Sequence, residues 1–162
     1  MKSFEGQPLE YKGENKLYHT ILVPLDGSKR AEAILPHLEE LARRYEAKVI
    51  FLQVIEPVLL VGGPEIVDMR QYEAAFEEQT KQAEVYLNAL KDEFSKKGIE
   101  SRILTAQGPV VEAIINVSQR ENVDLIAIAS HGRSGISRVF YGSVAAGVLH
   151  RVDRPLLLIR SG

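Results

Sequence analysis

Short apolar runs alternate with longer amphipathic segments along nearly the whole chain, and this alternation limits the fold more than any other feature. Five runs rich in β-branched residues are expected to form strands, at residues 20–25, 48–55, 100–105, 123–129 and 155–160. The segments between them, at residues 29–45, 67–97, 110–121 and 143–151, space their apolar residues by three and four, as helices do. Such alternation predicts βαβ units around a mostly parallel sheet.

The second, fourth and fifth runs are almost continuously apolar, which is typical of strands that helices cover on both faces. Because βαβ connections are right-handed, we expect an open α/β fold with five parallel strands in the order 3-2-1-4-5 and helices on both faces, as in Rossmann-like proteins. The strand order reverses between the first and fourth strands. A ligand crevice is therefore expected outside the carboxyl ends of these two strands.

The longest helical segment carries a single apolar stripe. The stripe contains Tyr72, Phe76, Ala83, Leu87, Leu90 and Phe94. Gly98 follows two lysines where a helix C-cap is expected. The stripe is interpreted as core and not as a cofactor site.

Composition indicates one domain in a reducing compartment. We expect a flexible tail at residues 1–17 and one globular domain at residues 18–162 of the 162. The chain has no cysteine, which excludes disulfides, thiolate metal sites and a cysteine nucleophile, and which agrees with a cytoplasmic location. No apolar run reaches the roughly 18 residues of a membrane span. The net charge of -2 argues against nucleic-acid binding.

Polar residues follow the first predicted strand in the sequence Asp26, Gly27, Ser28. Two interpretations of this turn remain open. Asp26 or Ser28 could accept bonds from free N–H groups at the start of the next helix. Alternatively, Asp26 could accept bonds from ligand hydroxyls, because it lies at the expected crevice.

A glycine-rich segment follows the fourth predicted strand and leads into a helix near Ser143. It contains Gly132, Gly135 and Gly142. Glycine lets a phosphate approach the backbone, and a helix amino terminus offers free N–H groups, so this segment predicts a phosphate site. Ser143 is expected either to cap the helix or also to reach a phosphate oxygen.

Two arginines and a histidine in this segment have simpler interpretations. Arg133 and Arg138 could neutralise phosphate charge, although exposed loop arginines usually meet only water. His131 has no histidine, cysteine or carboxylate partner at a metal-site or triad spacing, so we assign it to shaping the loop. The sequence also lacks GxxxxGK[ST], a GxGxxG after the first strand, and HExxH.

Several segments together resemble the universal stress protein family from about residue 19 to residue 160. They are ILVPLDGS, FLQVIEP, GPVVEAI, DLIAIASHGRSG, YGSVAAGVL and RPLLLIR. Nucleotide-binding members carry G-x2-G-x9-G-[ST]. The matching residues here are Ala129, Gly132, Gly142 and Ser143, so the spacing is kept and the first glycine is an alanine. The added methyl group could be neutral or could crowd the ligand.

The resemblance implies an adenine nucleotide site that holds ATP, ADP or AMP, with Mg2+ or Mn2+ bound through the phosphates. Asp26 would contact the nucleoside, and the Val54 backbone would meet the adenine edge. The implied site residues are Pro24, Asp26, Val54, Ile128, Ala129, His131, Gly132, Arg133, Gly142, Ser143 and Val144. The resemblance also implies a homodimer formed through the last strand.

We therefore expect an ATP-binding regulatory protein of the stress response that performs little chemistry. No residue of the loop is an evident base for activating water, so any ATP hydrolysis should be slow. Two alternatives remain. One is a slow ATP hydrolase that uses Asp26, His131 and Ser143, and the other is an interaction module that has lost nucleotide binding. The protein partner is not identified by the sequence.

Overall fold

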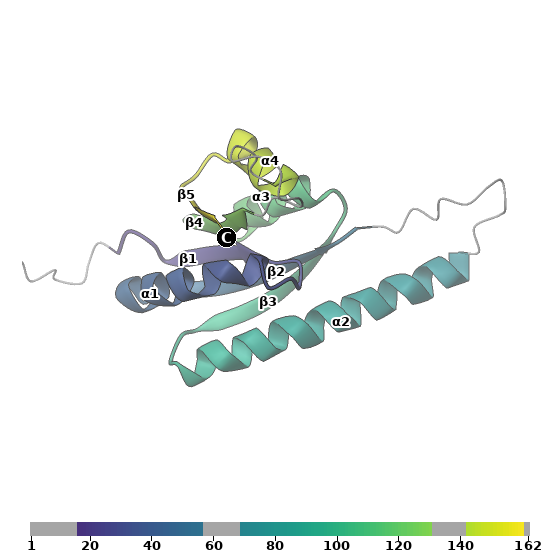
Figure 1. Ribbon diagram of the computed structural model, residues 1–162, viewed down its shortest axis with the longest axis horizontal. Helices are drawn as coiled ribbons and strands as arrows, with labels where there is room; N and C mark the ends of the chain where they lie inside the picture. Colours follow the sequence, from purple (N-terminus) through teal and green to yellow (C-terminus); the bar gives the residue numbers. More distant parts are fainter. Residues whose placement is uncertain (1–15, 57–68, 131–141, 161–162) are drawn as a thin grey trace, which may run out of the picture.

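Five parallel strands in the order β3-β2-β1-β4-β5 form the sheet, which confirms the predicted topology (Figure 1). The computed structural model describes residues 16–56, 69–130 and 142–160. The elements are β1 (Thr20–Pro24), the 3-10 turn η1 (Ala31–Ile34), α1 (Leu35–Tyr45), β2 (Lys48–Ile55), α2 (Met69–Lys96), β3 (Ser101–Gln107), α3 (Val110–Arg120), β4 (Leu125–Ser130), α4 (Ser143–Arg151) and β5 (Leu156–Arg160). The predicted tail at residues 1–17 lies almost wholly outside the described residues.

Helices cover both faces of the sheet, and the sheet separates the core into two layers. On one face, Phe51 of β2 and Phe94 of α2 make an edge-to-face contact with ring centroids 5.1 Å apart, and Leu38 of α1 joins the same cluster. On the other face, Leu22 of β1 packs with Ile114 of α3 and with α4. Side chains alternate between the faces of each strand, so a central strand needs apolar residues at nearly every position.

The start of β1 is fixed by a carboxylate from a distant part of the chain. Asp124 accepts backbone N–H bonds from His19 at 2.7 Å and from Thr20 at 2.8 Å. The Asp124 amide in turn donates to the Thr20 carbonyl at 2.9 Å. These bonds set the register of β1 beside β4, the pair at which the site was predicted.

The carboxyl-terminal half of α2 packs on the sheet, and its amino-terminal half extends past it (Figure 1). The predicted stripe is buried at Ala83, Leu87, Leu90 and Phe94, whereas Tyr72 and Phe76 are only half-buried. Gly98 has φ +76°, and the Ile99 amide reaches back to the Phe94 carbonyl at 3.0 Å. This is a Schellman ending, so the predicted C-cap is confirmed.

The two edge strands, β3 and β5, each pair with one neighbour. Residues Leu156 to Ile159 of β5 are half-buried, so this edge is partly open in the single chain. Dimerisation through β5 stays a prediction. Within the described ranges, none of the helices combines the length and apolar character of a membrane span.

Candidate functional site

The strands β1 and β4 stop pairing before either of them ends. Their register comprises Ile21 with Leu125 and Leu22 with Ile126. The Leu25 amide bonds the Leu52 carbonyl of β2 at 2.8 Å, so the neighbouring Pro24 faces β4. Because proline has no N–H, it cannot extend the β1–β4 ladder. The strands thus part at the switch point that the topology predicts for a ligand.

The turn after β1 supports the capping interpretation of Asp26 and Ser28. The Ser28 amide donates to Asp26 Oδ1 at 2.9 Å, and the Ala31 amide donates to Ser28 Oγ at 3.2 Å. Gly27 has φ +79°, a backbone conformation that favours glycine. Asp26 is exposed, so holding the turn leaves carboxylate surface facing outward.

The helix α4 begins at the predicted residue but with a different cap. Gly142 is the N-cap, Ser143 is the first helical residue, and no side chain of a described residue caps this end. The prediction of Ser143 as N-cap is therefore wrong. The backbone of Gly142 is already extended (φ -52°, ψ 153°), so the next residue enters the helix. Ser143 is exposed, and Val144 packs on the core around α3.

The alanine that replaces the first glycine of the family pattern is a core residue. Ala129 is 4% exposed and belongs to the cluster between the sheet and α1. It pairs with Ile159 of β5, and its neighbour Ile128 pairs with Leu158 and is also buried. The methyl group of Ala129 thus occupies space inside the core.

Three predicted site residues, His131, Gly132 and Arg133, lie outside the described residues, as do Gly135 and Arg138. Their predicted roles stay predictions. The described part of the predicted site comprises Pro24 and Asp26 after β1, Val54 on β2, Ile128 and Ala129 on β4, and Gly142 to Val144 at the start of α4. All of these elements meet the carboxyl edge of the sheet.

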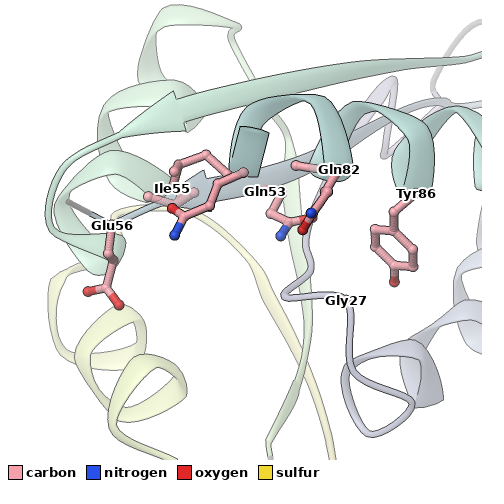
Figure 2. Close-up of a pocket in the computed structure, with 9 residues that line it drawn as sticks. Gly27, Gln53, Ile55, Glu56, Gln82 and Tyr86 are labelled. Carbon is pink, nitrogen blue, oxygen red and sulfur yellow. The ribbon is translucent and has the colours of Figure 1, made fainter. Parts of the chain in front are cut away.

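A pocket of about 480 Å³ opens at the carboxyl ends of the strands, between the end of β2 and the side of α2 (Figure 2). It is lined by Gly27 after β1, by Gln53, Val54, Ile55 and Glu56 of β2, and by Gln79, Gln82, Ala83 and Tyr86 of α2. We call it the β2–α2 pocket. Its volume is in the range of small-molecule sites. Of the predicted residues, Val54 lines it directly.

The polar residues of the β2–α2 pocket were missed by the sequence reasoning. Gln53 gave a usable signal, because it is the one polar side chain between Val49 and Ile55 in an otherwise apolar strand. Gln79, Gln82 and Tyr86 gave none, since polar residues on a helix ordinarily face water. Only the packing of α2 along β2 and β3 places them over the sheet edge.

One buried polar atom of this pocket, Gln53 Oε1, has no hydrogen-bond partner among the described residues. Burial raises the pKa of Tyr86, and the charge of Glu32, a hydrogen bond to the Glu32 side chain and the charge of Asp26 raise this pKa further. The Tyr86 hydroxyl therefore stays protonated at neutral pH. The same carboxylates make the local potential negative.

Among the described residues, no group of three or more histidine, aspartate or glutamate side chains is arranged to hold a metal ion. The residues that are present fit a nucleotide better than a directly bound metal ion. The first amides of α4 have no earlier helical carbonyl to bond, which suits phosphate oxygens. The polar lining of the β2–α2 pocket, with the unpaired Gln53 Oε1, suits an uncharged ring or sugar.

Comparison with known proteins agrees with this geometry. The model of the universal stress protein family matches residues 17–160. Universal stress protein MJ0577 of Methanocaldococcus jannaschii is 26% identical over 158 residues, which cover 89% of this chain and 96% of that protein. Its solved structure covers 90% of this chain and 98% of its own, with a TM-score of 0.76.

Two more distant structures share the fold. A universal stress protein solved in complex with cAMP is 20% identical, has a TM-score of 0.65, and covers 90% of this chain and 98% of its own. One from Archaeoglobus fulgidus, in complex with dAMP, is 21% identical, has a TM-score of 0.57, and covers 88% and 98%. The family model spans nearly the whole chain, so this protein belongs to the universal stress protein family.

Proposed function

We propose that this protein binds an adenine nucleotide, with ATP as the first candidate, at the carboxyl ends of β1, β2 and β4. The observation that carries the proposal is that two complementary features lie at the carboxyl ends of the strands. The β2–α2 pocket offers the buried, unpaired Gln53 Oε1 and other polar side chains for an uncharged nucleoside, and the start of α4 offers its first amides for phosphates. The cAMP and dAMP complexes of the two relatives support an adenine ligand.

The position of Ala129 favours retained binding. Its methyl group lies in the core cluster on the α1 side of the sheet, so it takes no room from a ligand outside the strand ends. Mg2+ or Mn2+ would be held mainly through the phosphates, since the described residues of the proposed site include no group arranged to hold a metal ion.

The role we propose is regulatory and not catalytic. Nucleotide occupancy would stabilise a cytoplasmic homodimer, formed along the open edge of β5, for recognition by a protein partner. Hydrolysis of ATP would be slow at most. The competing enzyme function requires sustained turnover that depends on Asp26, His131 and Ser143, and a single steady-state assay of phosphate release distinguishes the two functions.

The test is a thermal-shift titration with ATP and Mg2+, run beside adenosine, GTP and buffer. The expected result is a saturable rise in melting temperature with ATP that exceeds the rise with adenosine. No rise with any nucleotide would contradict the proposal and favour an interaction module without nucleotide.

Gly142→Val provides the matched variant for this titration. Gly142 has φ -52° and ψ 153°, which valine adopts without strain, so the fold should survive. The added side chain at the N-cap should block phosphate approach and weaken ATP binding by roughly tenfold or more, while adenosine is little affected. Unchanged ATP affinity in a folded variant would remove α4 from the site.

A further inference from the structure

Arg154 joins three parts of the chain at the point where β5 begins. Its Nη1 atom donates to the Ser118 carbonyl of α3 at 2.7 Å and to the Val123 carbonyl, just before β4, at 2.9 Å. The side chain of Arg154 is only 18% exposed. Hydrogen bonds from a charged donor are stronger than those between neutral groups, so this contact is expected to persist in competition with water.

Both accepting carbonyls belong to buried residues at the junction between α3 and β4. Ser118 lies in the last turn of α3, whose final carbonyls have no later helical amide to bond. The guanidinium supplies donors there, and its positive charge lies at the negative end of the helix dipole. Arg154 therefore ties the segment that leads into β5 to the end of α3 and to the start of β4.

The strand β5 has few other contacts that fix its position. Within the described sheet it pairs only with β4, over Leu156–Arg160. This ladder starts directly after Arg154, where the Ile126 amide donates to the Pro155 carbonyl at 3.0 Å. The four apolar side chains of β5 are only half-buried. The position of β5 therefore depends on its ladder with β4 and on the anchor that precedes it.

We infer that Arg154 is a positioning residue for the proposed dimer, because it holds β5 in place before two protomers meet. This inference rests on the proposed homodimer and adds the residue that prepares its edge. Without the guanidinium, β5 would separate from β4 in a fraction of the molecules. Both protomers need an ordered β5, so the apparent dissociation constant of the dimer rises with the inverse square of the ordered fraction. An ordered fraction of about one third would weaken the dimer roughly tenfold.

The test measures dimer dissociation constants by analytical ultracentrifugation in the presence of ATP and Mg2+. Arg154→Met, which keeps an unbranched apolar side chain and removes every donor, should weaken the dimer roughly tenfold. Arg154→Lys keeps the charge without the guanidinium fork and should weaken it less. Two controls should dimerise like the wild type. Asp153→Ala removes only the exposed ion-pair partner of Arg154, and Asp124→Ala destabilises the start of β1 without touching β5.

Hydrogen exchange of the monomer separates positioning from direct contact with a partner. It is measured at protein concentrations well below the dimer dissociation constant. The β5 amides that bond β4 should lose most of their protection in Arg154→Met, whereas the β1 amides should keep theirs. Should Arg154→Met fail to fold, Arg154→Lys provides the same comparison with a smaller expected change.

Each contrary result has a separate meaning. A wild type that stays monomeric with ATP would overturn the proposed homodimer together with this inference. A dimer of unchanged strength in Arg154→Met would overturn the inference alone. So would a weaker dimer in which β5 keeps its protection, because Arg154 would then contact the partner directly. An equal weakening in Asp124→Ala would also overturn it, since general destabilisation would then explain the loss.

Discussion

The packing of α4 against α3 depends on a glycine in the middle of α4, and replacing it gives a sharp test. A Cβ built at Gly147 lies 2.6 Å from Val111 Cγ2 and 3.3 Å from Val111 Cγ1. Ordinary carbon contacts are about 3.5–4.0 Å, so Gly147→Ala requires a relative shift of about 1 Å. This contact sets how closely α4, which begins at the proposed phosphate site, approaches α3.

The magnitude follows from two opposing effects. Alanine is better than glycine in a helix interior by about 1 kcal/mol. Overpacking by one methyl group costs about 1–3 kcal/mol. Gly147→Ala should therefore destabilise the protein by about 1 kcal/mol. In a Val111→Ala background the clash is absent, and the same change should stabilise it by about 0.5–1 kcal/mol.

The assay is a double-mutant cycle of urea unfolding followed by circular dichroism. The expected coupling between positions 147 and 111 is about 1–3 kcal/mol, well above the additivity error of such cycles, about 0.5 kcal/mol. Equal effects of Gly147→Ala in both backgrounds would refute the packing argument. They would mean that Val111 rotates away freely and that α4 is not positioned by this contact.

Three further predictions concern stability. Ala129→Gly should lower the free energy of unfolding by about 1–2 kcal/mol, because it removes a buried methyl group and adds backbone freedom. It should leave the ATP dissociation constant within about twofold. A large gain in affinity would show that the methyl group crowds the ligand. Asp124→Ala should cost about 1.5–3 kcal/mol because two β1 amides lose a charged acceptor. The control Glu100→Ala, which breaks an exposed ion pair with Lys48, should cost less than about 1 kcal/mol in the same urea assay, and similar costs for the two would contradict the anchoring role. The bond from Lys97, with help from Arg43, lowers the pKa of Glu39 below its model-compound value of 4.5, so its contribution is present above that pH and is lost as pH falls through the folded-state pKa. The stability difference between wild type and Glu39→Gln should therefore shrink in urea titrations below pH 4.5, and a difference independent of pH would contradict the ion pair.

The strand order could be predicted from the sequence because apolar periodicity and the handedness of crossovers leave few topologies. The predicted strand boundaries were less accurate where a strand begins close to the end of a helix. Val123 was predicted to start the fourth strand, but its amide bonds the Ser118 carbonyl and so belongs to the ending of α3. At β3 the strand runs on to Gln107, because its last residues pair with Gln53 to Ile55 of β2.

The candidate site likewise contains positions that the sequence predicts and positions that it does not. Asp26 follows β1 and Val54 lies near the carboxyl end of β2, so a known strand order is enough to bring these two positions to the same end of the sheet. The α2 residues of the β2–α2 pocket depend instead on which turns of a 28-residue helix reach the sheet. That register is set by the burial of Ala83, Leu87 and Phe94, and the stripe alone does not say which strand end it faces.

The charge distribution at the carboxyl ends of the strands would give the proposed nucleotide one favoured orientation. Glu56 lines the β2–α2 pocket and Glu32 and Asp26 act on its Tyr86, whereas the start of α4 carries the positive end of a helix dipole. A nucleotide bound in the reverse direction would bring its phosphates to the carboxylates and its base to the free amides of α4. The carboxylates would repel the phosphates in that direction, and the attraction between the phosphates and the α4 amides would be lost, so both effects select the same orientation.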